Sequence, residues 1–186
     1  VYLENYRVTV AEQLIPSAEI SEQISLAGTE ASGTSNMKFM INGAVTLGTL
    51  DGANVEISEQ VGEDNIFLFG LKAHEVDELW RRGYSPTDYL RANADLQAVV
   101  DMLTSNVLGA RFDDIAKALL TNAYGTADAY MALADFEDYR ATQQRISKDF
   151  LDRDNWNKMS LMNIAGSPAF FVDRTVQEYC DRIWNM

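Results

Sequence analysis

The chain has 186 residues, of which 47% are hydrophobic, and its 28 acidic and 15 basic residues give a formal net charge of −13. A chain of this length can bury a hydrophobic core and fold as one domain of ordinary size. The excess of acidic residues argues against a nucleic-acid-binding protein, because phosphate backbones are bound by clustered Lys and Arg side chains. No apolar run in the sequence has the length of a bilayer span, so we expect no membrane partner.

Strand-like and helix-like segments alternate over the first 70 residues. In chain order we expect a strand at 1–5, a helix from 9 that ends at Pro16, an extended run at 21–28, a short helix that ends at Gly43, a β-rich run at 44–52 closed by an Asp-Gly turn, a helix over 53–61 that ends at Gly62 and an apolar strand at 65–70. This alternation is typical of β-α-β units in a parallel sheet. The apolar strands show little alternation, which indicates a sheet covered on both faces. The sequence therefore predicts an α/β fold.

From Lys72 onward the sequence consists mostly of amphipathic helical segments. We expect helices within 74–83, 86–105, 113–123, 135–152, 154–166 and 173–185. The large aromatic and methionine side chains of this part are expected to pack the helices together, and they are Trp80, Tyr89, Met131, Phe136, Trp156 and Met159. The acidic runs are interpreted as solvated helix faces.

The cysteine and histidine content limits the chemistry that the chain can perform. His74 is the only histidine and lies in a charged segment at the expected start of a helix, so no three-histidine zinc site can be built and no metal site is expected. A Ser-His-Asp triad is not expected either. Cys180 is the only cysteine and is interpreted as a structural thiol on a helix, in keeping with a reducing compartment. Because the sequence begins at Val1 with strand-forming residues and no leader-like segment, we expect it to begin inside a domain.

The segment GTEASGTSNMKFMING, residues 28–43, combines glycines, small hydroxyl residues and one lysine, Lys38. A loop of this composition that opens into a helix presents free backbone N–H groups at the positive end of the helix dipole, which favours an anion. We expect Met37, Met40 and Ile41 on one face of the helix, with Lys38 on the neighbouring face. Side chains of a helix lean toward its N-terminus, so Lys38 is predicted to reach toward the loop.

Spacing alone leaves the role of Lys38 open. A P-loop is rejected because the segment lacks the GxxxxGK[ST] order. One functional interpretation is that the Lys38 amine, desolvated between Met37 and Phe39, reacts with an aldehyde cofactor whose phosphate is held by the loop. The simpler interpretation, which spacing favours, is an exposed helical lysine after an ordinary turn.

Sequence similarity that extends beyond this segment favours the functional interpretation of Lys38. The segment EASGTSNMKFMINGA at 30–44, with LENYRV at 3–8 and GTLDGANVEI at 48–57, is similar to the α-glucan phosphorylase family of glycogen, starch and maltodextrin phosphorylases. The match continues in order through EDNIFLFG, RRGY and DRTVQEY. It covers nearly the whole chain and is tightest over residues 3–70. The SGTSNMKF core is highly specific.

The resemblance implies a role for each matching residue. Lys38 would be the catalytic lysine that carries pyridoxal 5′-phosphate covalently. The remaining positions would be Gly33, Thr34 and Ser35 for the cofactor phosphate, Tyr6, Arg7 and Val8 for the walls of the cofactor pocket, and Glu30 with the backbone at Ser32 and Gly33 for sugar hydroxyls. Members of the family often have Gly where this chain has Ser35, which leaves the backbone donor intact unless the position needs a positive φ. Without the resemblance, Glu30 would be interpreted as a solvated loop acid.

The resemblance also implies a fold and an activity. Residues 1–70 would be part of the second Rossmann-like domain of a GT-B glycosyltransferase fold, and 71–186 a mainly helical C-terminal region of the same domain. The family phosphorolyses the terminal α-1,4-linked glucose of a glucan to glucose 1-phosphate with retention, so its partners would be an α-1,4-glucan and inorganic phosphate. A cytoplasmic homo-oligomer is expected. The isolated chain is expected to be inactive and to self-associate. The competing interpretation is a non-enzymatic module that binds a phosphorylated ligand or mediates oligomerisation.

Overall fold

A three-stranded parallel β-sheet lies at the centre of the N-terminal part of the chain. The structure, a computed structural model, describes residues 2–107 and 109–186. The strands are β1 (Ile20–Gln23), β2 (Val45–Gly48) and β3 (Phe67–Leu68), in the spatial order β1-β2-β3 with both pairs parallel. The expected α/β class and the parallel β-α-β connections are therefore confirmed.

The helices expected before and between the strands are present. They are α1 (Val8–Leu14), which continues into the 3-10 turn η1 (Ile15–Ser17), α2 (Ser35–Ile41), and α3 (Asn54–Val61) with the 3-10 turn η2 (Glu63–Asn65). Pro16 lies in η1, where its missing N–H ends the α-helical hydrogen bonding. Gly43 and Gly62 follow α2 and α3 with φ values of 84° and 81°, which glycine adopts without a steric penalty.

The strands are shorter than predicted: the runs expected at 44–52 and 65–70 are strands only over Val45–Gly48 and Phe67–Leu68, and two other predictions differ more. Residues 2–5 form no strand: Tyr2 is 92% exposed and Asn5 has a positive φ of 52°, so this segment pairs with no neighbouring strand, and Val1 lies outside the described residues. The extended run expected at 21–28 is a strand only over Ile20–Gln23. The last residue pair of β1 and β2 is Gln23 with Gly48, and the chain leaves the sheet at Ile24.

The second part of the chain is helical, as predicted. Its helices are α4 (Ala73–Arg82), α5 (Pro86–Ala92), α6 (Ala94–Thr104), α7 (Asp113–Leu120), α8 (Ala132–Asp149), α9 (Arg153–Gly166) and α10 (Val172–Tyr179), with the 3-10 turns η3 (Asn122–Tyr124) and η4 (Ser167–Phe170) and the π-helical segment η5 (Cys180–Trp184). The single helix expected within 86–105 is broken at Asn93, because the Asn93 Oδ1 accepts hydrogen bonds from the backbone N–H groups of Asp95 and Leu96 and starts a new helix. No helix in the described part of the chain has both the length and the apolar character needed to cross a membrane.

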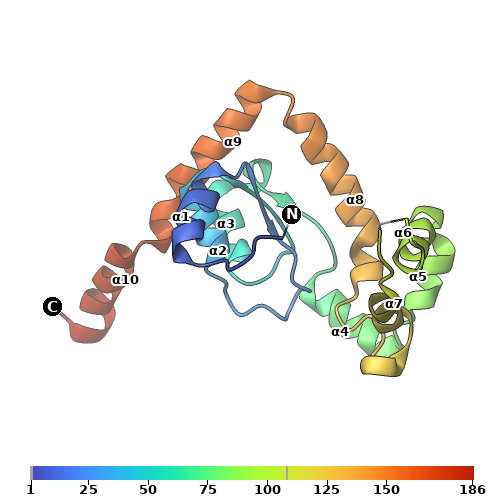
Figure 1. Cartoon of the computed structure of the whole chain (residues 1–186). Helices are drawn as coiled ribbons and strands as arrows, with labels where there is room; N and C mark the ends of the chain where they lie inside the picture. Colours follow the sequence, from blue (N-terminus) through green and yellow to red (C-terminus); the bar gives the residue numbers. More distant parts are fainter. Residues whose placement is uncertain (1, 108) are drawn as a thin grey trace.

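Helices cover both faces of the sheet. Figure 1 shows α8 and α9 meeting at an angle beside the sheet, with α4–α7 gathered at one end of α8 and α10 projecting away from the sheet. On one face Val45, Leu47 and Phe67 pack against Ile146 of α8 and Trp156 of α9. The other face is covered by α2 and α3, whose buried side chains Met40, Ile57 and Val61 pack with Ile66 and Leu68. The prediction of a sheet buried on two sides is confirmed, and the helices after residue 130 complete its core.

A buried carboxyl group joins α8 to the segment that follows β3. Asp135 is 8% exposed, and its Oδ1 accepts a hydrogen bond of 2.8 Å from the Leu71 backbone N–H. Burial, followed by the nearby carboxylates Asp138, Asp128 and Glu75, raises the pKa of Asp135 above its ordinary value. Ionisation of Asp135 is therefore disfavoured in the folded chain.

We expect the free energy of unfolding to depend on pH through Asp135. The stabilising contribution of Asp135 to the free energy of unfolding is fully present below about pH 4, the ordinary Asp pKa in an unfolded chain. This contribution is lost as the pH rises through the raised pKa of Asp135 in the folded chain. Asp135→Asn keeps an acceptor for Leu71 and removes the charge, so urea unfolding should show a smaller loss of stability between about pH 4 and pH 7 than in the parent chain. Asp77→Asn, at an exposed position of α4, is the control. Identical pH profiles for Asp135→Asn and the parent chain would contradict this assignment.

Candidate functional site

Lys38 lies in the middle of the short helix α2, directly after the glycine-rich loop. The buried positions of α2 are Asn36 and Met40, whereas Ile41 is 41% exposed, so the expected apolar face of Met37, Met40 and Ile41 is wrong in part. Asn36 takes a buried position because its side chain is hydrogen bonded. With Asn36 and Met40 facing the core, Lys38 and Asn42 lie on the exposed side of α2. The Asn42 Nδ2 donates to the Lys38 carbonyl oxygen at 2.8 Å.

A pocket of about 570 Å³ lies between α1 and α2, and Lys38 is one of its lining residues. The lining side chains are Tyr6, Val8, Ala11, Glu12, Ile15, Pro16, Thr34, Ser35, Lys38 and Asn42. Tyr6 and Val8, which lie more than 25 positions before Thr34 and Ser35 in the sequence, thus share one pocket with them and with Lys38. All four residues were expected at the site. The volume lies within the range of small-molecule sites, roughly 300–1,000 Å³.

The Lys38 side chain is exposed, so the expectation of an amine desolvated between Met37 and Phe39 is wrong. Successive residues of an α-helix point about 100° apart, which places Met37 and Phe39 on other sides of α2 rather than beside the amine. The solvent-accessible position leaves the amine open to a ligand in the pocket. Glu12 supplies a carboxylate to the same pocket.

Arg7 and Gly33 are not among the residues that line the pocket. Arg7 precedes α1 and its Nε donates a 3.0 Å hydrogen bond to the Thr9 Oγ1, which holds the guanidinium along the helix. Gly33 has a φ of 92°, and a Cβ there would lie 3.0 Å from the Asn36 Nδ2. Gly33 therefore shapes the loop through its backbone conformation.

Ser35 is the first residue of α2 and has an ordinary right-handed helical conformation, so serine is tolerated at this position. Its hydroxyl donates a 3.3 Å hydrogen bond to the Gln23 Oε1 at the end of β1. Thr34 is the residue before the helix and makes no side-chain cap, although the Lys38 N–H donates to its carbonyl oxygen at 3.3 Å. The Thr34 hydroxyl is thus not used to cap α2.

The loop that carries Glu30 and Ser32 is held by the turn after β2. The backbone N–H groups of Thr29 and Glu30 donate to the Asp51 Oδ2 at 3.1 and 2.8 Å. The Ala53 N–H donates to the Ser32 carbonyl oxygen at 2.7 Å. The side chains of Glu30 and Ser32 are exposed. The loop therefore has a fixed backbone and presents its side chains to solvent.

Three polar side chains that position this loop were not predicted from the sequence. The Asn36 Nδ2 donates to the Asn54 Oδ1 at 3.2 Å and to the Ser32 carbonyl oxygen at 3.3 Å, and the Asn54 Nδ2 donates to the Thr49 carbonyl oxygen at 3.0 Å. Asp51, described above, is the third. Asn36 and Asn54 are both buried, and a buried amide needs such partners. The available signal was the Asp-Gly turn followed by an asparagine in TLDGAN.

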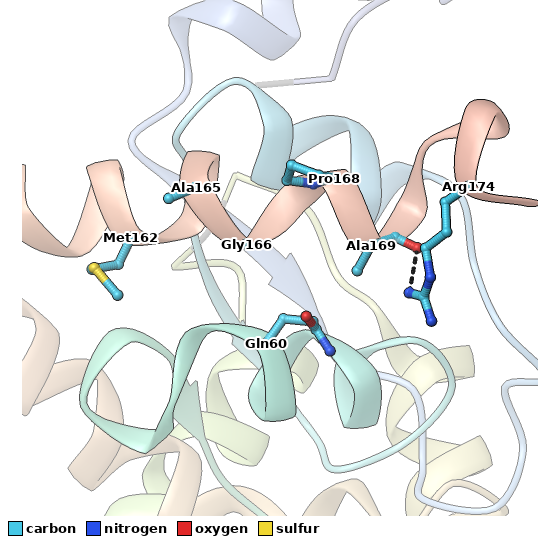
Figure 2. A pocket seen from close by; sticks show the side chains of 7 residues that line it. All are labelled: Gln60, Met162, Ala165, Gly166, Pro168, Ala169 and Arg174. Carbon is cyan, nitrogen blue, oxygen red and sulfur yellow. Dashed lines mark hydrogen bonds between the residues drawn. The ribbon is translucent and has the colours of Figure 1, made fainter.

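A second pocket, of about 610 Å³, lies between α3 and the C-terminal helices and contains none of the expected site residues. Figure 2 shows Gln60 of α3 facing the α9–η4 segment, with Arg174 at one end. The Arg174 side chain already donates to the Ala169 carbonyl oxygen at 2.9 Å and to the Glu178 Oε1 at 3.1 Å. Because Arg174 is already engaged and none of the expected site residues lines this second pocket, the Lys38 pocket is the better candidate site.

Comparisons with known proteins show the family of this chain. A family profile described as carbohydrate phosphorylase matches residues 1–186. The human liver and muscle forms of glycogen phosphorylase are each 45% identical to this chain over 186 residues. Glycogen phosphorylase of Haemophilus influenzae is 47% identical over 190 residues. Each alignment covers 100% of this chain and 22% of the relative, so the chain spans about one fifth of the length of these relatives. The chain therefore belongs to the carbohydrate phosphorylase family.

Proposed function

We propose that this chain is the pyridoxal-phosphate-bearing part of an α-glucan phosphorylase. The whole protein would phosphorolyse the terminal α-1,4-linked glucose of glycogen or a related glucan to glucose 1-phosphate with retention of configuration. The observation that carries the proposal is the placement of Lys38, within the SGTSNMKF motif, on a pocket shared with Tyr6 and Val8 of the LENYRV motif. The identity to glycogen phosphorylases along the entire chain supports it.

The residues at the Lys38 pocket suit pyridoxal 5′-phosphate. Lys38 offers an accessible amine for an aldehyde, and Thr34 and Ser35 place hydroxyl groups on the wall of the same pocket. We propose that the backbone at Gly33, Thr34 and Ser35 holds the cofactor phosphate. When bound, the cofactor supplies a phosphate group that takes part in proton transfer with the substrate phosphate. Tyr6, Arg7 and Val8 would enclose it, and Arg7 would have to leave Thr9 to reach it.

We propose that the loop beside this pocket binds the sugar. Glu30 is exposed on a loop whose backbone is fixed by Asp51, so its carboxylate can accept hydrogen bonds from sugar hydroxyls without a further cost of ordering the loop backbone. The backbone at Ser32 and Gly33 would supply further contacts. Pre-organisation of this kind is favourable for a site that must orient a sugar against a phosphate.

The wider arrangement follows from the same proposal. Residues 1–70 would belong to the second Rossmann-like domain of a GT-B fold, and residues 71–186 would be its helical C-terminal region. An α-1,4-glucan and inorganic phosphate are the proposed partners, a homo-oligomer is the proposed assembly, and the cytoplasm is the proposed location. The lone cysteine supports a reducing compartment.

Pyridoxal phosphate followed by borohydride reduction is expected to label Lys38 in preference to the other lysines. The Lys38 pocket gathers aldehyde-reactive and phosphate-binding groups, whereas Lys158 is an exposed lysine in the middle of α9 outside it. Peptide mass spectrometry of the reduced protein measures the label at each lysine. Lys38→Arg should remove most of the specific label and Lys158→Arg should remove almost none. Equal labelling of both lysines in the parent chain would count against the proposed site.

The 186-residue chain by itself is expected to release no measurable glucose 1-phosphate from glycogen and phosphate. Phosphorolysis brings two phosphate groups together, and Lys38 is the single Lys or Arg side chain among the described residues that line the pocket, where Glu12 adds a negative charge. Electrostatic stabilisation of the transition state is usually the largest catalytic contribution, so an incomplete set of cations should abolish turnover. A coupled assay for glucose 1-phosphate measures the turnover of the chain. Turnover comparable to that of a full-length relative would refute the expectation.

A further inference from the structure

Asn36 and Asn54 form a buried pair that joins the helix of Lys38 to the turn after β2. Asn36 lies in the first turn of α2 and is 2% exposed, and Asn54 is the first residue of α3 and is 4% exposed. The Asn36 Nδ2 donates to the Asn54 Oδ1 at 3.2 Å, although the two residues are 18 positions apart in the sequence. Amides that leave solvent need such partners, so the pair fixes the start of α2 against the start of α3.

Both amides also bond to the backbone on either side of the pair. The Asn54 Nδ2 donates at 3.0 Å to the carbonyl oxygen of Thr49, the residue after β2. The Asn36 Oδ1 accepts from the Met37 N–H at 2.9 Å, and the Asn36 Nδ2 donates to the Ser32 carbonyl oxygen at 3.3 Å. The pair therefore completes a continuous chain of hydrogen bonds from the end of β2 to the glycine-rich loop.

Two glycines leave room for this pair. A Cβ at Gly33 would lie 3.0 Å from the Asn36 Nδ2. A Cβ at Gly48, the last residue of β2, would lie 2.7 Å from the Asn54 Nδ2 and 2.7 Å from the Gln23 carbonyl oxygen. A backbone oxygen cannot rotate away from a side chain, so glycine is required at the end of β2 for the strand and the amide to lie this close together.

The Ser32 carbonyl oxygen sets the direction of the next N–H group in the loop. It accepts from Asn36 and also from the Ala53 N–H at 2.7 Å, so it points toward the start of α3. In a trans peptide the carbonyl oxygen and the following N–H point in opposite directions, so the Gly33 N–H points away from α3. No residue that the structure describes accepts a hydrogen bond from the N–H groups of residues 33–35. The loop is thus held through its carbonyl oxygen and keeps these three donors for a ligand.

We propose that Asn36 and Asn54 are positioning residues that orient the glycine-rich loop for the phosphate of the cofactor at Lys38. The proposal rests on the proposed function for the identity of that ligand. It adds two residues that are not among the described lining of the Lys38 pocket. It also gives the segment GTLDGANVEI at 48–57 a role that needs no ligand contact, because its Thr49 and Asn54 anchor the hydrogen bonds that reach the loop.

Labelling of Lys38 by pyridoxal phosphate and by pyridoxal, which lacks the phosphate, tests the proposal in the full 186-residue chain. Both aldehydes meet the same exposed amine. The ratio of the two labels after borohydride reduction, measured by peptide mass spectrometry, therefore reports the contribution of the phosphate. Asn36→Ala and Asn54→Ala should each lower this ratio by roughly fivefold to tenfold, because each removes hydrogen bonds that hold the loop. Labelling by pyridoxal should stay at the level of the parent chain.

Asn163→Ala is the matched control for the loss of a buried amide. Asn163 lies in α9 and is 0% exposed. Its Nδ2 donates to the Asn65 and Met159 carbonyl oxygens at 2.8 and 3.0 Å, so the same substitution removes buried hydrogen bonds outside the Lys38 pocket. Asn163→Ala should lower the midpoint of urea unfolding and leave the label ratio at Lys38 unchanged.

A double variant shows whether the two residues act together. Because Asn54 reaches the loop through Asn36, Asn36→Ala combined with Asn54→Ala should lower the ratio no further than Asn36→Ala alone. The parent ratio in Asn54→Ala, or pyridoxal labelling that falls in step with pyridoxal phosphate labelling, would overturn the proposal. Asn54→Ser, whose hydroxyl is too short to reach the Asn36 amide, provides the same comparison if the alanine variant does not fold.

The parent chain distinguishes this proposal from the proposed function. A preference of Lys38 for pyridoxal phosphate that is equal in the parent chain and in Asn54→Ala would remove only the positioning role. A parent chain that labels Lys38 no better than Lys158, or no better with pyridoxal phosphate than with pyridoxal, would contradict the cofactor site, and the positioning role would fall with it.

Discussion

Replacing Trp156 by alanine is expected to lower the free energy of unfolding by about 3–5 kcal/mol. Trp156 is 1% exposed and packs between Phe67 of β3 and Phe150, with ring centroids 6.1 and 5.0 Å away. Its Nε1 also donates a 2.9 Å hydrogen bond to the Glu19 Oε2 just before β1. The substitution leaves a cavity under the sheet and removes the donor, so urea unfolding followed by circular dichroism should show a markedly lower midpoint.

A matched tryptophan separates burial from residue type. Trp184 is 54% exposed near the end of the chain and contacts Tyr179, so Trp184→Ala should change the free energy of unfolding by no more than about 0.5 kcal/mol. Trp156→Phe should fall between the two, because it retains an aromatic ring but loses the hydrogen bond to Glu19. Equal losses for the two alanine variants would show that α9 does not anchor the sheet.

Periodicity and turn chemistry predicted most of the architecture. Pro16 and the glycines after α2 and α3 each have a local steric effect, so the helix ends they predict agree with the structure, whereas β2 ends at Gly48, before the Asp-Gly turn at 51–52. The strand expected at 1–5 failed for a different reason. Strand-forming residues adopt a strand only where another strand supplies hydrogen bonds, and local propensity does not report on that partner. The break at Asn93 was missed because apolar spacing continues across it while its side chain caps α6.

The candidate site was predictable to the extent that it lies in contiguous motifs. The loop-helix composition around Lys38 indicated an anion site, and the resemblance supplied the other residues, of which Tyr6, Val8, Thr34 and Ser35 share its pocket. The exposure of Lys38 could not be read from Met37 and Phe39, because hydrophobic neighbours in sequence are not neighbours on a helix surface. The supports of the Glu30 loop, Asp51 and Asn54, follow a different strand, so only the tertiary structure brings them to it.

Gly52→Ala is expected to cost about 2–5 kcal/mol, as the sum of a backbone conformational cost and an overpacking cost. Gly52 has a φ of 51°, and a Cβ at this position would lie 2.6 Å from the Ser32 carbonyl oxygen and 3.0 Å from the Glu30 Cγ. A backbone oxygen cannot rotate away as a flexible side chain can. The loop must therefore move, which breaks the 2.7 Å hydrogen bond from the Ala53 N–H to Ser32.

Gly83→Ala is the matched control for this effect. Gly83 has a left-handed conformation with a φ of 89°, and no described atom lies within 4 Å of the position that an alanine Cβ would occupy, so the substitution carries only the conformational cost of about 1–2 kcal/mol. Amide hydrogen exchange distinguishes the two variants locally: the Thr29, Glu30 and Ala53 amides should exchange faster in Gly52→Ala and at the parent rate in Gly83→Ala. Preferential Lys38 labelling should also decrease in Gly52→Ala alone, because the displaced Ser32 leads directly into Gly33 and Thr34 at the start of α2. Unchanged exchange at those three amides in Gly52→Ala would mean that the turn after β2 does not hold the Glu30 loop.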